Sequence, residues 1–199
     1  KNNDPEILKL LLSNKADVNL RGLNDNFDDL DWTTALFAAV SEGQLKIVKI
    51  LLSNGADVNQ RKTHRLKRIR SNLPTIRDGE TALMYATIKN DLEIMKLLIL
   101  NGADVNAKSG RHYAAFRFAL DLDHLEASKL LISNGLDFHD YDKYTCPLSL
   151  AAQKQNLEII KLLLFKGASV REVQKNNIAI LASPISSECN SNALEIMNF

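Results

Sequence analysis

Four histidines and two cysteines are the side chains best suited to nucleophilic or metal-binding chemistry in this 199-residue chain. They are His64, His112, His124, His139, Cys146 and Cys189. Cys146 and His139 could form a nucleophile–base pair, but no orienting motif accompanies them. The sequence contains no C-x-x-C or H-E-x-x-H spacing and no glycine-rich phosphate loop. We therefore expect no catalytic residue, no metal site and no cofactor.

Aspartates and asparagines recur in pairs, but always within one short motif. Lys-Ala-Asp-Val-Asn at 15–19 returns as Gly-Ala-Asp-Val-Asn at 55–59 and 102–106, with degenerate copies at 135–139 and 167–171. Successive copies start 40, 47, 33 and 32 residues apart. A side chain that recurs with the repeat period is better explained as a turn-forming hydrogen bonder than as a catalytic acid.

Two helices are expected in each repeat. A wide apolar stretch precedes each copy of the motif, and the glycine that follows is well placed to end a helix. A shorter helix is expected before each stretch, at 34–40, 81–87, 114–119 and 147–152. Thr34 and Thr81 are suitable N-caps, and Cys146 is expected to be a small packed group at the same position.

The sequence resembles the ankyrin repeat family. The resemblance rests on Thr-Ala-Leu at 34 and 81, the variant Cys146-Pro147-Leu148, the alanine pairs at 38–39 and 151–152, and the Gly-Ala-Asp-Val-Asn endings. It implies an all-α solenoid of about five to six helix-turn-helix units with β-hairpin fingers. It also implies a structural role for His124 between two helices.

The resemblance implies one array over residues 1–199, without separate domains. Both ends of the sequence look like partial repeats, so we expect a segment of a longer protein. The last unit, 172–199, is irregular, and its first helix is expected at 178–182. Asn90, Asp123 and Gln155 stand where Gly43 lies between two helices, and Asn and Asp tolerate the left-handed conformation.

Lys and Arg number 25 and Asp and Glu 24, a net charge of +1 that excludes a uniformly basic nucleic-acid binder. The longest apolar runs are a few residues, so no membrane span is expected. Two lone cysteines fit a reducing compartment. We expect a cytoplasmic protein, or one in a host cytosol if it is a secreted effector.

Two insertions distinguish the first repeats from the others. The acidic finger, about 20–33, carries Asp25, Asp28, Asp29 and Asp31, followed by Trp32. The basic finger, about 60–78, carries Arg61, Lys62, Arg65, Lys67, Arg68, Arg70 and Arg77, and no acid before Asp78. Leu66, Ile69 and Leu73 predict a short amphipathic helix ending at Pro74.

Three interpretations of the basic finger stay open. It is a solvated loop, it faces the acidic finger, or it binds an acidic protein, phosphate groups or nucleic acid. No aromatic residues alternate with the charges, so base stacking is not favoured.

The other candidate surface is the concave face that the family forms from finger ends and first helices. By the resemblance, its variable positions are Trp32, Ser41, Glu42, Arg77, Lys89, Arg111, Tyr113, Asp121, Lys143, Gln153 and Lys154. We expect non-catalytic binding of a protein partner there. The alternatives are a targeting or regulatory segment of a longer protein, such as a bacterial effector or host-range factor, and anion or nucleic-acid contact through residues 61–77.

Overall fold

The structure is a computed structural model that describes residues 4–24, 31–64, 79–109, 113–138 and 146–169. The chain divides into two compact units, Lys1–Leu136 and Asp137–Phe199, and each is described by itself. The predicted amphipathic helix at 66–73 and the irregular last unit at 172–199 lie outside the described residues. The single continuous array therefore stays a prediction.

The first unit alternates short and long helices, as predicted. The short first helices are α2 (Ala35–Ser41), α4 (Ala82–Ile88) and α6 (Ala115–Asp121). The longer second helices are α1 (Pro5–Ser13), α3 (Leu45–Ser53), α5 (Leu92–Leu100) and α7 (Leu125–Ser133). The second unit holds one further pair, α8 (Pro147–Gln153) and α9 (Leu157–Phe165).

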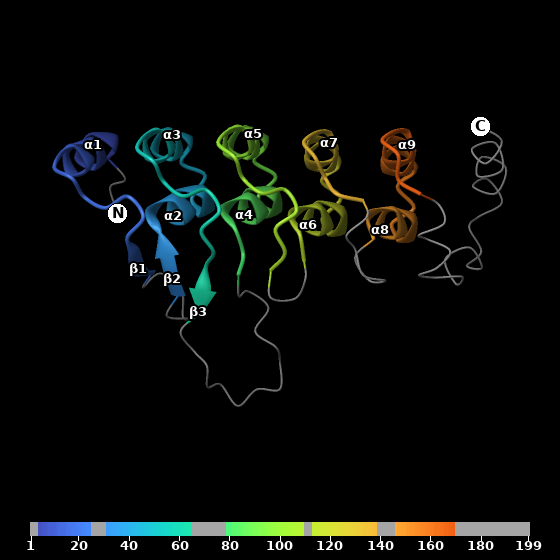
Figure 1. Cartoon of the computed structure of the whole chain (residues 1–199), viewed down its shortest axis with the longest axis horizontal. Helices are drawn as coiled ribbons and strands as arrows, with labels where there is room; N and C mark the ends of the chain where they lie inside the picture. Colours follow the sequence, from blue (N-terminus) through green and yellow to red (C-terminus); the bar gives the residue numbers. More distant parts are fainter. Residues whose placement is uncertain (1–3, 25–30, 65–78, 110–112, 139–145, 170–199) are drawn as a thin grey trace, which may run out of the picture. The chain divides into compact units, whose positions relative to one another are not determined.

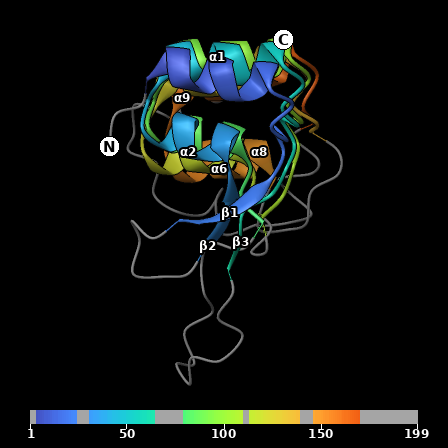
Figure 2. The same ribbon diagram turned by 90° about the vertical axis from the view of Figure 1, so that its left-hand side faces the viewer.

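Within the first unit the helices form two layers (Figure 1). First helices pack beside one another, α2 against α4 and α4 against α6, and second helices pack in the order α1, α3, α5, α7. Each first helix also packs against the second helix that follows it. Figure 2 shows the first helices between the second helices and the strands, so one side of the first-helix layer faces the fingers.

Apolar side chains between the two layers make the core. Leu36, Leu83 and Phe116 on the first helices and Leu51 and Leu98 on the second helices are almost wholly buried. The helix α1 differs, because it buries no residue and exposes Ile7, Leu10 and Leu11. It packs against α3 and has no first helix beside it among the described residues.

Three short strands extend from the first-helix side. They are β1 (Arg21–Asn24), β2 (Asp31–Thr34) and β3 (Thr63–His64), in the antiparallel order β1-β2-β3. The strands β1 and β2 form the hairpin of the acidic finger, and β3 begins the basic insertion. The two fingers are therefore neighbours joined through their backbones.

The predicted caps and turns are confirmed. Thr34 Oγ1 accepts a hydrogen bond from Phe37 N at 3.3 Å, and Thr81 Oγ1 accepts one from Met84 N at 3.4 Å. Glycine follows the C-cap of α3 with φ of 82°. Between first and second helices, Gly43, Asn90, Asp123 and Gln155 all have φ between 54° and 67°.

No helix in the described part of the chain is long and apolar enough to cross a bilayer.

Candidate functional site

The repeated aspartates and asparagines are structural, as predicted. In the three repeats that carry both residues, the Asp carboxylate accepts the backbone N–H of the Asn two residues on, at 2.9 Å for Asp17 and Asn19. The Asn side chain then reaches the next repeat, where Asn59 Nδ2 donates to Gly102 O at 2.9 Å and Asn59 Oδ1 accepts from Asp104 N at 2.8 Å. Asn19 makes the same two bonds to Gly55 and Asp57. The Asp side chains therefore stabilise the turn within a repeat, and the Asn side chains join that turn to the next repeat.

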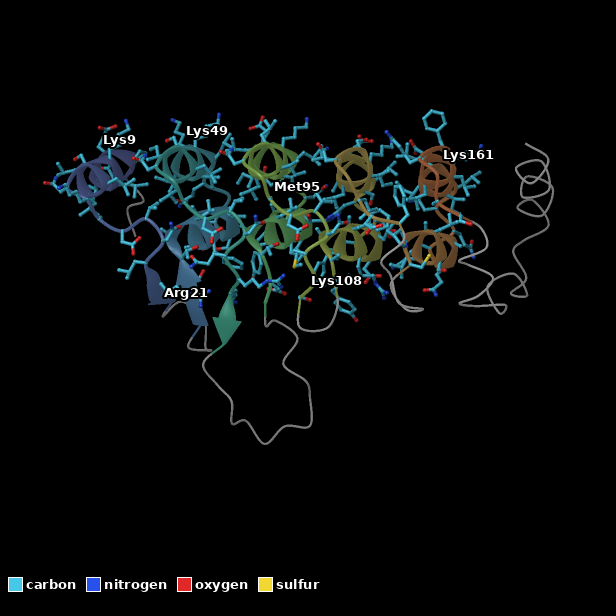
Figure 3. All side chains as sticks on the ribbon, viewed as in Figure 1. Lys9, Arg21, Lys49, Met95, Lys108 and Lys161 are labelled. Carbon is cyan, nitrogen blue, oxygen red and sulfur yellow. The ribbon has the colours of Figure 1, made fainter. Side chains whose placement is uncertain are left out.

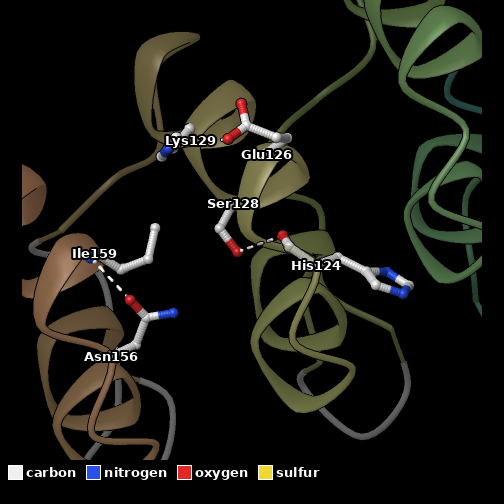
Figure 4. A network of polar contacts seen from close by, with 6 residues as sticks. All are labelled: His124, Glu126, Ser128, Lys129, Asn156 and Ile159. Carbon is white, nitrogen blue, oxygen red and sulfur yellow. Dashed lines mark hydrogen bonds and ion pairs between the residues drawn. The ribbon is translucent and has the colours of Figure 1, made fainter.

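His124 also has the structural role that was predicted for it. Its Nδ1 lies 3.0 Å from the carbonyl oxygen of Thr87, which can only accept, so Nδ1–H donates across to the preceding repeat. The equivalent Asn156 instead caps its own helix, accepting from Ile159 N at 3.1 Å (Figure 4). Asp91, at the same position before α5, also caps its own helix by accepting from Ile94 N at 3.0 Å, so His124 uses this position differently from Asp91 and Asn156.

Cys146 is buried at the N-cap of α8 and makes no side-chain cap bond, as expected for a small packed group. His139 lies outside the described residues, so the Cys146–His139 pair is not described. Among the described residues, no group of three or more His, Cys, Asp or Glu side chains could hold a metal ion.

The structure describes seven of the eleven side chains predicted for the concave face, five of them in the first unit. Ser41, Glu42, Lys89 and Asp121 lie where first helices end, and Tyr113 lies where a finger returns to α6. None of these five is buried. Gln153 and Lys154 end α8 in the second unit and are exposed. Trp32 lies in β2, where only the backbone is described, and Arg77, Arg111 and Lys143 lie outside the described residues.

Tyr113 and Asp121 belong to one side-chain assembly that Arg117 holds together. The Arg117 guanidinium carbon lies 5.3 Å from the centre of the Tyr113 ring, within cation–π range. Arg117 Nε lies 2.6 Å from Asp121 Oδ2, a salt bridge between residues four apart on α6. The Phe118 ring stands almost perpendicular to the Tyr113 ring, with centroids 5.8 Å apart. We call Tyr113, Arg117, Phe118 and Asp121 the α6 cluster.

The α6 cluster is half-buried rather than free in solvent. The Arg117 side chain is 25% exposed and the Asp121 side chain 36% exposed. Because two partners hold the guanidinium, its planar face is fixed while part of it still meets solvent. Tyr113 and Asp121 were predicted from the sequence as surface positions, but Arg117 and Phe118 were not. A signal was present for Arg117, because it lies four residues before Asp121, a spacing that lets an arginine and an aspartate pair on a helix.

A second aromatic contact joins α2 and α4. The Phe37 and Tyr85 rings lie 4.8 Å apart, tilted by 60°. Lys62 Nζ lies 5.9 Å from both ring centres, and the residue is only 3% exposed. Lys62, at the start of the basic finger, is therefore packed against α2 and α4. A residue that binds a partner at the surface would need an exposed side chain, and the side chain of Lys62 is buried.

The structure describes only parts of the acidic and basic fingers. Arg61 is exposed at the start of the basic finger. Arg65, Lys67, Arg68 and Arg70 lie outside the described residues, as do Asp25, Asp28 and Asp29. Asp31 pairs through its backbone with His64, and Trp32 with Thr63. The two ends of the basic finger are tied by Lys62 N to Glu80 O and Gly79 N to Lys62 O, each at 2.9 Å.

A family model described as ankyrin repeats in three copies matches residues 1–62 and 63–142, and one described as an ankyrin repeat matches 145–176. The chain belongs to the ankyrin repeat family. Its fold is accordingly an all-α ankyrin solenoid, as the sequence predicted. No curated protein matches the chain. Ankyrin repeats are generally protein–protein interaction modules.

Proposed function

We propose that this ankyrin-repeat chain is a non-catalytic module that binds a partner protein through the first-helix face of its first unit. The observation that carries the proposal is the α6 cluster. Tyrosine and arginine are among the residues most often responsible for binding energy in interfaces. Here both are partly exposed and already fixed by neighbours. Side chains that are ordered before binding lose less entropy when a partner arrives.

Direct selection of binders tests this proposal without knowledge of the natural partner. A displayed random-peptide library is selected on the intact chain, and each binder is measured against Tyr113→Ala and Arg117→Ala. We expect most binders to lose at least about tenfold in affinity, which is the range of interface hot spots. Binders that are unaffected by both substitutions would contradict the proposal.

The chain offers a matched control for the loss of a helix-surface salt bridge. Lys129 Nζ lies 2.9 Å from Glu126 Oε1 on α7, so Lys129→Ala also breaks an ion pair between neighbouring turns (Figure 4). This pair lies on a second helix, away from the proposed surface. Lys129→Ala should leave the selected binders unaffected, which separates loss of a contact from a general loss of stability.

Contact of the basic finger with an anion is a second candidate. Arg61 begins this finger in an exposed position, and the insertion carries seven positive side chains with no acid among them. Binding to a polyanion should then fall steeply as salt is added and should disappear when Arg65, Lys67, Arg68 and Arg70 are neutralised. Absence of polyanion binding at low salt would remove this candidate.

We place this interaction in the cytoplasm, or in a host cytosol if the protein is exported. The support is that Cys146 is a free, buried thiol, a state that a reducing compartment preserves. Fractionation of cells that express the full-length protein would test the location.

A further inference from the structure

The three first helices of the first unit end in residues of different chemical character. Glu42, Lys89 and Leu122 are the C-caps of α2, α4 and α6, so they occupy the same position in three successive repeats. All three are exposed, and Leu122 keeps 46% of its surface in solvent. Because α4 packs against both α2 and α6, the three residues follow one another across the layer of first helices. We call Glu42, Lys89 and Leu122 the end row.

The two charges of the end row are not paired by their own helices. Three and four positions before Glu42 and Lys89 stand only alanines and Tyr85, which offer no opposite charge one turn away. Within the part of the chain that the structure describes, Glu42 and Lys89 form no ion pair, either with each other or with another residue. Both charges are therefore available to a partner.

A row of uncharged side chains runs beside the end row. Ala38, Tyr85 and Phe118 each lie four residues before a member of the end row, and so on the same side of their helix. All three are partly exposed. Phe118 also belongs to the α6 cluster, where its ring lies 5.8 Å from that of Tyr113. The end row is thus continuous with the α6 cluster, and the uncharged row offers area for the apolar part of an interface.

The order of side chains gives this surface a direction. The end row is negative on α2, positive on α4 and apolar on α6. A charged group of a partner placed on Leu122 would lose water without gaining an opposite charge. A polyanion such as a nucleic acid would bring phosphates to both charges, and Glu42 would repel them. A polypeptide segment with side chains of both signs fits this surface better.

We propose that the end row selects the order of side chains in the bound segment of the partner protein. A basic residue lies opposite Glu42, an acidic residue opposite Lys89 and an apolar residue opposite Leu122. The acidic residue is therefore between the other two, whichever way the segment runs. This inference rests on the proposed function, because it names the partner chemistry of the same face. Exposed charge pairs of this kind contribute more to selectivity than to affinity.

Parallel selection of peptides on two forms of the chain tests the order. One form is the intact chain, and the other is the double variant Glu42→Lys/Lys89→Glu, which exchanges the two charges and keeps the net charge. The same displayed random-peptide library is selected on each form, and binders that weaken when Tyr113→Ala is added are kept. We expect an acidic residue between a basic and an apolar residue from the intact chain, and a basic residue in the middle from the variant. The same middle residue from both forms would overturn the proposal.

Single charge reversals assign each contact. Binders selected on the intact chain should weaken about three- to tenfold in Glu42→Lys, as measured by fluorescence anisotropy. A peptide whose basic residue is replaced by glutamate should regain affinity for Glu42→Lys. Lys89→Glu should behave in the same way toward the acidic residue of the peptide. Loss of affinity without this recovery would overturn the assigned pairs.

The chain offers a matched control on the outer side of the second helices. Glu6 Oε1 and Lys9 Nζ lie 2.8 Å apart on α1, and both side chains are exposed. Figure 3 shows Lys9 on the side of the helices away from the strands. Glu6→Lys/Lys9→Glu also exchanges two opposite charges at constant net charge, and it should change neither the selected sequences nor their affinities. An effect equal to that of the end-row exchange would overturn the proposal.

The failure of this proposal can be told from the failure of the proposed function. Binders that weaken in Tyr113→Ala but ignore the exchange of Glu42 and Lys89 would refute the end row and leave the proposed function standing. Binders that ignore both Tyr113→Ala and Arg117→Ala would refute the proposed function and the end row with it. Because the exchanged side chains are exposed, every charge variant should fold as the intact chain does, which circular dichroism checks.

Discussion

Lys62 lies with its ammonium nitrogen equidistant, at 5.9 Å, from the rings of Phe37 and Tyr85. It is almost fully buried, as is Glu80, with which it pairs through the backbone. A lysine that is removed from water needs compensating interactions, and two aromatic faces supply part of them. Lys62 therefore ties the start of the basic finger to α2 and α4.

Lys62→Ala should lower the free energy of unfolding by about 2 kcal/mol, because a desolvated cation–π contact is worth about that much. Denaturant unfolding followed by circular dichroism measures the change. Lys62→Met retains most of the side-chain volume and should still lose stability if the charge matters. Lys49→Ala, at an exposed position, should change stability by less than about 0.5 kcal/mol. A Lys62 variant as stable as the Lys49 variant would contradict this role.

Gln155 has φ of 54°, a left-handed conformation that glycine adopts at much lower cost. Gln155→Gly should therefore raise the free energy of unfolding by about 1 kcal/mol. The reverse change, Gly43→Gln, should lower it by a similar amount. A Cβ on Gly43 would meet nothing within 4 Å, so the loss would come from the backbone alone. Thermal unfolding of both variants checks the prediction, and a destabilised Gln155→Gly would refute it.

At the scale of the elements, adjacent repeats are joined by the same asparagine bridge. Asn59 uses its amide oxygen and its amide nitrogen on the backbone of the next repeat, at 2.8 Å and 2.9 Å. A side chain that both accepts and donates can satisfy two backbone groups at once. This bridge, together with the core between the helix layers, holds each turn in place beside its neighbour.

Asn59→Ala should lower the free energy of unfolding by about 1–3 kcal/mol, since it removes two hydrogen bonds of about 0.5–1.5 kcal/mol each. Hydrogen exchange should show faster exchange at Asp104, whose N–H loses its acceptor. The control is Asn54→Ala, because Asn54 Nδ2 donates to Ile50 O within its own repeat. Asn54→Ala should leave exchange at Asp104 unchanged. Unchanged exchange at Asp104 in Asn59→Ala would rule out the bridge as a link between repeats.

At the scale of the whole molecule, the repeated motif predicted the helix pairs, the caps and the turns. These features depend on local chemistry that recurs along the chain: threonine before α2 and α4, and residues with positive φ between first and second helices. The contacts of Arg117 and Lys62 were harder to predict. The contacts of Arg117 with Tyr113, and of Lys62 with Phe37 and Tyr85, depend on where a finger meets a helix, and the two residues do not recur with the repeat.

The net charge also shows how features of the sequence differ from what the three-dimensional structure adds. A net charge of +1 gives no sign of a local site. The structure shows that Arg21 donates to the backbone carbonyl of Arg61, and Arg61 to that of Lys108, so two of the positive side chains connect neighbouring repeats. The positions of the charged residues therefore say more about the local structure than their sum does.

The central claim is that a partner protein binds the first-helix face around the α6 cluster. Hydrogen–deuterium exchange of the chain with and without a selected binder tests it most directly. We expect slower exchange in bound chain around Tyr113 and along α4 and α6. Protection confined to the second helices α3, α5 and α7, with no change near Tyr113, would contradict the claim.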